Sequence, residues 1–269
     1  MIRKKSLFGC GITAVFIVVA TASVAQLVDT AMNAYAQKTT LSEPTQQQQP
    51  TFFPAFLSTN QTSEGWMTSF DLENCDFASR GENSYFILEP GYQVTLVGEE
   101  DGEELQLVMT VLNETKVVNG IETRIVEEKE TEGGNLVEVS KNYFAICKPS
   151  NNAIYFGEDV DMYDNGKVMN HEGSWLAGQN DAKAGLIIPG KVEVGMKYYQ
   201  EIAPGVAEDR AEIVSVTALL ETPAGIFKEV LKTEETNPLK PDEKEYKFYA
   251  PGIGLIQDEA IKLVKYTKP

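Results

Sequence analysis

The sequence predicts an all-β protein, an antiparallel meander of two related units of about 105 residues that form a curved sheet or half-open barrel. Segments such as residues 104–112 are rich in valine, leucine and threonine and partly alternate apolar with polar side chains, which is typical of strands with one buried face. Turn-forming pairs such as Asn119-Gly120 separate these segments, because both central positions of a tight hairpin favour a positive φ. No stretch after residue 64 has the spacing of an amphipathic helix.

The N-terminal segment predicts export from the cell. Basic residues 3–5 precede an almost uncharged apolar run, residues 7–25, and this order is typical of a secretory signal. We expect residues 1–36 to be a signal peptide cleaved after "AYA", and the mature protein to be extracellular or held at the cell surface. The apolar run has about the 20 residues that span a bilayer, so an uncleaved anchor is the alternative.

Glutamine and proline are frequent in residues 37–64, which have no apolar periodicity to bury, and we expect a disordered linker there. The remaining residues, 65–269, are expected to fold as a single duplicated β-domain. Its two units span about 85–172 and 190–269. A chain of this length is sufficient for one sizeable hydrophobic core.

Corresponding residues recur in the two units at a spacing of about 105. Both units have a glycine near a tyrosine, a Gly-Ile pair after a turn, and two aromatic residues followed by alanine. These are Gly91 and Gly195, Gly120-Ile121 and Gly225-Ile226, and Tyr143-Phe144-Ala145 and Phe248-Tyr249-Ala250. The spacing is too long for a solenoid repeat, so it indicates two copies of one β-unit. A single copy has few strands and one apolar face, so we expect the copies to share a core.

The chain is strongly acidic, with 23 lysine and arginine residues against 40 aspartate and glutamate residues and a net charge of −17 at pH 7. Nucleic acids and acidic membrane surfaces are bound by clustered basic side chains, which this sequence lacks, so neither is an expected partner. Membrane contact is expected only through an uncleaved N-terminal segment. The charges are spread along the strands, and we expect them on a solvated face.

Cys75 and Cys147 are the two cysteines that follow the signal segment. An even number of cysteines in an exported domain predicts a disulfide between them. The alternative is a pair of buried thiols that never meet. Neither cysteine belongs to a C-x-x-C motif, so zinc binding and redox chemistry are not indicated.

Residues 155–166 hold four carboxylates, Glu158, Asp159, Asp161 and Asp164, and these are the candidate metal ligands. A calcium loop places oxygen ligands at alternate positions, but Tyr163 occupies the next alternate position after Asp161. We therefore expect a β-hairpin that turns at residues 164–166, with calcium binding as the alternative. No other cofactor is predicted.

The sequence lacks the motifs of the common catalytic sites. It has no G-x-S-x-G, no Gly-rich phosphate loop, and His171 as its only histidine. Gln200-Glu201 and the segment 207–209 are candidates for paired-carboxylate chemistry only because the chain is acidic throughout. We therefore expect a non-enzymatic protein with no catalytic residues. A hydrolase that uses acidic residues, with or without calcium, is the alternative.

The series "YFGED…GSWLAG…IIPG…VGMKYYQEIAPGVAED…YAPGIG" resembles a family of uncharacterised secreted prokaryotic proteins. The resemblance covers about residues 85–256 and is specific as an ordered series rather than motif by motif. It implies secretion and β-structure, and the family has no established activity. This chain has Ile154 where the family pattern has tryptophan, which argues against an aromatic role at that position.

The signal segment, the internal duplication and the aromatic residues of the predicted strands together favour a secreted or surface-tethered binding protein. A Gly-rich loop, residues 173–195, carries Trp175 between the two units, and long ordered loops often bind ligands. We expect Trp175, Tyr199 and Tyr249 to line a concave face that binds an apolar small molecule or an envelope component. A structural envelope module without a ligand is the alternative.

Overall fold

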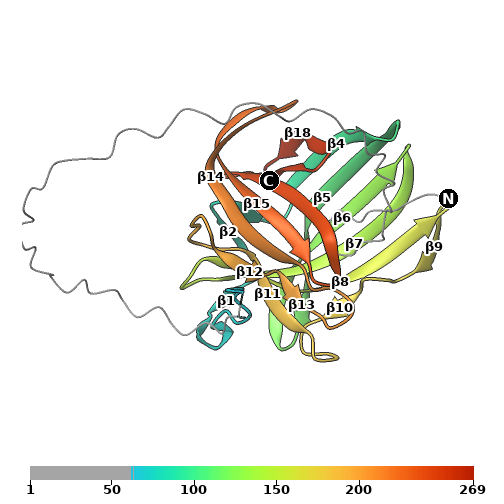
Figure 1. Ribbon diagram of the computed structural model, residues 1–269. Coiled ribbons are helices and arrows are strands. Elements are labelled where there is room, and N and C mark those ends of the chain that lie inside the picture. The colour runs from blue at the N-terminus through green and yellow to red at the C-terminus, as the bar shows by residue number, and fades with distance from the viewer. Residues whose placement is uncertain (1–61, 63) are drawn as a thin grey trace, which may run out of the picture. The chain divides into compact units, whose positions relative to one another are not determined.

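The computed structural model describes residue 62 and residues 64–269 (Figure 1). The predicted signal peptide and nearly all of the predicted linker lie outside these residues. The part of the chain that the structure describes is built from strands and one 3₁₀ turn, η1 (Leu72–Asn74), and it contains no helix long and apolar enough to cross a bilayer. The all-β prediction is therefore confirmed.

Sixteen of the strands form one antiparallel sheet that is nearly closed into a barrel with one seam, and a two-stranded sheet, β2–β3, accompanies it (Figure 1). The strand order is β12-β14-β15-β16-β17-β18-β4-β5-β6-β7-β8-β11-β13, with β1 on β7 and with β9 and β10 on β8. The strands are β1 (Phe77–Ala78), β2 (Gly81–Asn83), β3 (Phe86–Leu88), β4 (Gln93–Glu100), β5 (Glu103–Val118), β6 (Ile121–Glu132), β7 (Asn135–Cys147), β8 (Asn152–Asp164), β9 (Lys167–Asn170), β10 (Trp175–Leu176), β11 (Lys183–Ile188), β12 (Lys197–Tyr199), β13 (Glu201–Ile202), β14 (Arg210–Thr222), β15 (Gly225–Asn237), β16 (Lys240–Ala250), β17 (Gly254–Asp258) and β18 (Ile261–Thr267).

One short segment holds the two sides of the seam together. The strand order begins with β12 and ends with β13, and these strands are separated in sequence only by Gln200. Tyr198 of β12 pairs with Ala211 of β14, whereas Glu201 of β13 pairs with Ala184 of β11. Residues 197–202 therefore hydrogen-bond to both edges of the sheet, so that neither edge is left open along this segment.

Gly185 allows the closing segment to cross β11. A Cβ atom built at this position would lie 2.2 Å from the carbonyl oxygen of Gln200, which is closer than real Cβ contacts approach. The missing side chain is thus what lets the backbone at residue 200 lie directly against β11.

The predicted duplication corresponds to strand bounds that recur along the chain. The hairpin β5–β6 and the hairpin β14–β15 begin about 107 residues apart. The backbone N–H of Gly91 donates to the Val111 carbonyl at 2.8 Å, and that of Gly195 donates to the Ile213 carbonyl at 2.8 Å. These hydrogen bonds fit two related units, but the duplication itself stays a prediction.

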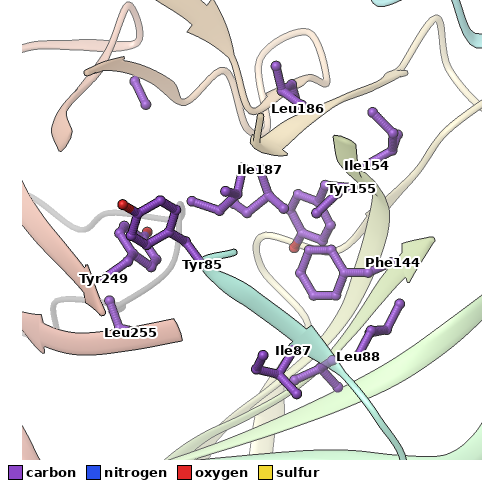
Figure 2. Packing of buried hydrophobic residues seen from close by; sticks show 14 of the residues in the cluster. Tyr85, Ile87, Leu88, Phe144, Ile154, Tyr155, Leu186, Ile187, Tyr249 and Leu255 are labelled. Carbon is purple, nitrogen blue, oxygen red and sulfur yellow. The ribbon is translucent and has the colours of Figure 1, made fainter. Parts of the chain in front are cut away.

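The interior of the barrel has an apolar half and a polar half. Near the β5–β6, β7–β8 and β16–β17 turns, Phe144, Tyr155, Tyr249 and Leu255 point inward (Figure 2). The β2–β3 hairpin fills this half with its own side chains, which include Ile87 and Leu88. Further along the same strands, the inward side chains become polar and acidic.

The β2–β3 hairpin, called the plugging hairpin below, is hydrogen-bonded to β15. Tyr85 lies in its turn, and the Tyr85 hydroxyl donates to the Glu229 carbonyl of β15 at 3.0 Å. The ring of Phe144 stacks on that of Tyr155 with centroids 4.7 Å apart, and Phe86 meets Phe144 edge-on at 4.9 Å. Aromatic pairs of this geometry add about 0.5–1.5 kcal/mol each beyond burial. The apolar half is therefore a packed core.

A disulfide joins Cys75 to Cys147, which confirms the predicted pairing. It links the segment that precedes the plugging hairpin to the end of β7, and β1 pairs beside it through Phe77 and Cys147. The cross-link therefore fixes the N-terminal segment to the barrel wall.

We expect the Cys75→Ser/Cys147→Ser double variant to lose about 4 kcal/mol of unfolding free energy, because the disulfide closes a loop with a sequence separation of 72 residues in the unfolded chain. Urea unfolding followed by near-UV circular dichroism measures the difference. Reducing agent should destabilise the natural chain by a similar amount and leave the double variant unchanged. Equal stabilities of the two chains would contradict the structural role of the disulfide.

We expect Gly185→Ala to destabilise the fold by about 3 kcal/mol, because the new methyl group overlaps the backbone of the closing segment. Lys183→Ala is the control, since that side chain is exposed on the same strand. Thermal unfolding compares the two variants. Similar melting temperatures for both would show that the closing segment does not lie against β11.

Candidate functional site

The polar half of the interior holds an unusual number of buried acids. Within residues 64–269, seven carboxylate side chains are buried, and they come from β6, β7, β8, β13, β15 and β17: Glu128, Glu130, Glu138, Glu158, Glu201, Glu235 and Asp258. The expectation that the charges lie on a solvated face is wrong for these seven. Aspartate and glutamate are rarely fully buried unless they are paired, so this group is the candidate functional site.

Strand register places the acids of β6, β7 and β8 on one face. Glu130 is directly opposite Glu138, and Glu158 is directly opposite Asn142. Directly opposed residues of an antiparallel pair point to the same side of the sheet. The hydroxyl of Tyr155 donates to Asn142 Oδ1 at 2.6 Å, which connects this acidic wall to the packed core.

Lys247 is at the centre of the opposite wall. Its Nζ lies 3.2 Å from Glu235 Oε2 and 3.7 Å from Asp258 Oδ2, and all three side chains are buried. Glu235 Oε1 also accepts hydrogen bonds from Thr233 Oγ1 at 3.1 Å and Gln200 Nε2 at 3.3 Å. Although burial opposes it, the charges of Asp258 and Glu235 raise the pKa of Lys247, so this lysine stays protonated.

The two walls are close enough to interact electrostatically. Burial raises the pKa of Glu158 well above its usual range, and the charges of Glu138, Glu128 and Asp209 raise it further. Asp209 follows β13 in the chain, so these charges come from both sides of the interior. Burial likewise raises the pKa of Asp258, against the opposing effect of Lys247.

Glu128 has no partner. It is 1% exposed on the inner face of β6, opposite Ser140, and neither of its carboxylate oxygens has a hydrogen-bond partner in the described part of the chain. Burial raises its pKa to about 8, while Lys247 partly offsets this and Glu138 raises it further. A buried carboxylate without hydrogen bonds is costly, so its retention calls for a functional or structural explanation.

Glu201 and Asp209 form a carboxylate pair at the seam. The Asp209 backbone N–H donates to Glu201 Oε1 at 2.9 Å, and Asn237 Nδ2 donates to Asp209 Oδ1 at 2.8 Å. Burial, followed by the neighbouring charge of Asp209 and a side-chain hydrogen bond to it, raises the pKa of Glu201. Two adjacent carboxylates cannot both ionise cheaply, so the pair shares a proton.

These acids greatly outnumber the buried cations. Among the described residues, the buried basic side chains are Lys247 and Arg124, and Arg124 donates to the backbone carbonyls of Ser79 and Asn113 instead. An uncompensated buried charge costs several kcal/mol. The polar half must therefore be neutralised, either by protons on the carboxylates or by a cation that enters from solvent.

A pocket of about 230 Å³ opens at the seam beside this site. Its lining comes from the loop 174–182 and the turn after β13, with Asp159 at its side, and it includes Trp175 and Ala203. Trp175 Nε1 is buried there without a hydrogen-bond partner in the described part of the chain. One oxygen of Asp209, Oδ2, is likewise buried without a hydrogen-bond partner among the described residues.

The structure does not bring the three predicted ligand-binding residues together. Trp175 lines the seam pocket, and its ring meets Tyr155 edge-on at 5.2 Å. Tyr249 lies in the packed core, with its hydroxyl 3.5 Å from Glu235 Oε1. Tyr199 lies on β12 with its ring 6.3 Å from that of Trp66.

The four predicted metal ligands are also divided between the two faces of β8. Glu158 points inward, whereas Asp159 accepts hydrogen bonds from Lys116 and Tyr143 outside the barrel, and Asp161 lies 2.8 Å from the ring of His171. Although burial opposes it, the hydrogen bonds from Lys116 and Tyr143 lower the pKa of Asp159. In the described residues, no group of three or more acidic, cysteine or histidine side chains is arranged to hold a metal ion.

The hairpin expected at residues 164–166 is present, since β8 ends at Asp164 and β9 begins at Lys167. Asn165 and Gly166 both have positive φ, at 50° and 73°, as the turn chemistry predicts.

Sequence reasoning missed most of the carboxylates of the site. The alternation of side chains along each strand could have revealed them. Glu128 and Glu130 lie an even number of residues from the buried Val126 on β6, and Glu138 lies an even number from the buried Phe144 on β7. An acid in phase with apolar residues of a strand predicts an inward carboxylate.

The chain matches no protein-family model, no curated protein and no solved structure. The resemblance to a family of secreted proteins therefore stays a prediction, and the function is argued from the geometry alone.

We expect the protein to be less stable at pH 8 than at pH 5. Burial raises the pKa of Glu128 to about 8 and that of Glu245 to about 7. Because the folded chain binds these protons more tightly than the unfolded chain, stability falls as pH rises from about 4.5 through these values. Glu128→Gln should reduce the loss between pH 5 and pH 8 by about 3 kcal/mol.

Urea unfolding at the two pH values measures this loss. The exposed Glu104→Gln is the matched control and should leave the loss unchanged. A loss of the same size in Glu128→Gln and in the natural chain would show that Glu128 is not protonated on folding.

Proposed function

We propose that this protein is an exported, non-enzymatic binding protein that holds an organic cation in the polar half of its barrel. The observation that carries the proposal is Glu128, a buried carboxylate that has no hydrogen-bond partner within the described residues and lies among six other buried acids and one buried lysine. A bound cation would supply the missing charge and the missing hydrogen-bond donors in one step. The disulfide supports an oxidising compartment such as the cell exterior.

The geometry favours a cationic ligand over the purely apolar ligand expected from the sequence. The apolar half of the interior is occupied by the chain's own Tyr85, Ile87 and Leu88. The polar half has carboxylates on both walls, so an entering molecule meets acceptors rather than hydrocarbon. An envelope component with an ammonium or guanidinium group fits this chemistry as well as a free small molecule.

The carboxylates are distributed along the interior rather than gathered around one point. A calcium ion is bound by six to eight converging oxygens. An organic cation has several N–H donors on an extended framework and is matched better by carboxylates on different strands.

The Glu201–Asp209 pair supports one alternative, a hydrolase that uses acidic residues. Two carboxylates that share a proton resemble the catalytic pair of aspartic-type hydrolysis. Substrate hydrolysis that disappears in Glu201→Gln would favour this alternative over binding alone.

We expect hexylamine to bind the full chain saturably and the neutral hexanol, which has the same hydrocarbon chain, to bind at least tenfold more weakly. Isothermal titration calorimetry at pH 8 measures both, with calcium chloride as the metal probe. Affinity for hexylamine should fall as pH is lowered from 8 to 6, since protons then compete for Glu128.

The Glu128→Gln variant should bind hexylamine at least tenfold more weakly, and Glu104→Gln should bind it as the natural chain does. Saturable binding of hexanol but not of hexylamine would favour the apolar ligand. Saturable binding of calcium alone would favour a metal site, and no binding of any amine would refute the proposal.

A further inference from the structure

The seam pocket and the carboxylate interior share one side chain, Trp175. Trp175 lines the pocket, and on β10 it is directly opposite Glu158 of β8. Directly opposed residues share a face of the sheet, with Cβ atoms about 4.5–5.5 Å apart. The same ring packs edge-on against Tyr155, whose hydroxyl belongs to the polar network.

The second side of the pocket leads to the same carboxylates. Ala203 lines it, and this residue follows the buried Glu201 by two positions in the chain. The charge of Glu158 raises the pKa of Glu201, so the acid paired with Trp175 and the acid near Ala203 in the chain lie within electrostatic reach of one another. Glu158 is thus the cross-strand neighbour of one pocket residue, Trp175, and Glu201 lies two residues from another, Ala203.

The lining of the pocket is mixed. Leu176, Ala182, Pro204 and Val206 give it apolar surface, and Ser174 and Gln179 give it polar groups. Its volume, about 230 Å³, is below the roughly 300–1,000 Å³ of sites for drug-sized ligands, so a bound molecule must be small or slender.

We propose that the seam pocket is the mouth of the cation site and that the ligand is an aliphatic amine, whose ammonium group passes Trp175 to reach Glu158 and Glu201 while its hydrocarbon part stays in the pocket. This inference rests on the proposed function. It adds the route and the ligand class: an ammonium group lies favourably on an indole face, and the apolar lining covers the methylene groups.

The ammonium group and the hydrocarbon part of the proposed ligand explain why an amine should bind better than a neutral alkyl chain or a divalent ion. An ammonium group donates three hydrogen bonds, which Glu128, Glu158 and the Glu201–Asp209 pair accept once protons are displaced. Glu128 belongs to this set because its charge raises the pKa of Glu158. A neutral alkyl chain would fill the pocket but leave these acids protonated. A divalent ion would lose its water shell without finding converging ligands in the described residues.

The chain has two tryptophans, which allows the route to be tested directly. In Trp66→Phe the only tryptophan emission is that of Trp175. In Trp175→Phe it is that of Trp66, whose ring contacts Lys197 and Arg210 and does not line the pocket. We expect hexylamine to change the emission of Trp66→Phe with the concentration dependence found by calorimetry. Emission of Trp175→Phe should not change.

A positive charge added at the pocket rim tests whether the ligand enters through the seam pocket. Gln179 is exposed at the pocket rim, and Gln179→Arg should slow hexylamine association at least fivefold in stopped-flow measurements, through repulsion and obstruction. Thr217→Arg adds the same charge at an exposed position of β14 and should leave the rate unchanged. Glu158→Gln should weaken binding at least tenfold, and Glu104→Gln should not.

Two failures can be told apart. Calorimetric binding of hexylamine with no change in Trp175 emission and no effect of Gln179→Arg would overturn the seam route and leave the proposed function intact. Absence of calorimetric binding to the natural chain would overturn both. Equal binding by the natural chain and Glu158→Gln would overturn the assignment of the ammonium group to that carboxylate.

Discussion

The closure of the sheet by residues 197–202 is the constraint on which the rest of the structure depends. This segment pairs with β14 on one side and with β11 on the other. The first and last strands of the strand order, β12 and β13, are therefore separated only by Gln200. Closure removes free strand edges, and it also determines what becomes interior. Every side chain in phase with the inner face is then shielded from water, whether it is apolar or charged.

The consequence of that shielding differs between the two halves. Around Phe144 and Tyr155 the enclosed side chains are aromatic and apolar, and the β2–β3 hairpin completes their packing. Around Lys247 the enclosed side chains are acids, and one lysine cannot neutralise them. The first half stabilises the barrel through burial, whereas the second lowers that stability, because buried acids without matching cations are costly.

The sequence predicted the strands, the turn at residues 164–166 and the disulfide, because each has a signal that can be read from local sequence or from a residue count. These signals are the alternation of apolar and polar residues, an Asn-Gly pair, and two cysteines in a domain predicted to be exported. The closing contact has no such signal, since it depends on a six-residue segment, residues 197–202, that meets β11 and β14 in space. The inward acids were missed for another reason. Glutamate was assigned to the solvated face by its type, although the phase of Glu128 and Glu138 with apolar neighbours indicated the interior.

Trp175 was predicted as a ligand residue from its place in a long Gly-rich loop, and it lies at the seam pocket. Tyr199 and Tyr249 were predicted from aromatic content alone, and they lie on β12 and in the packed core. Composition identified aromatic residues but could not place them, because the face of a strand depends on register, and register here shifts at several bulges, such as that between Asn142 and Phe144 of β7.

The pairing of β18 with β4 has a consequence for how the chain acquires its structure. Lys262 pairs with Val97, so the last strand of the sequence completes the sheet beside one of the first. No intermediate of synthesis can form this contact until the residues of β18 have emerged. Folding that waits on such distant partners is slow, and the unpaired edge of β4 stays available to neighbouring chains meanwhile. The strong negative charge then acts as protection during maturation, since nascent molecules of like charge repel one another.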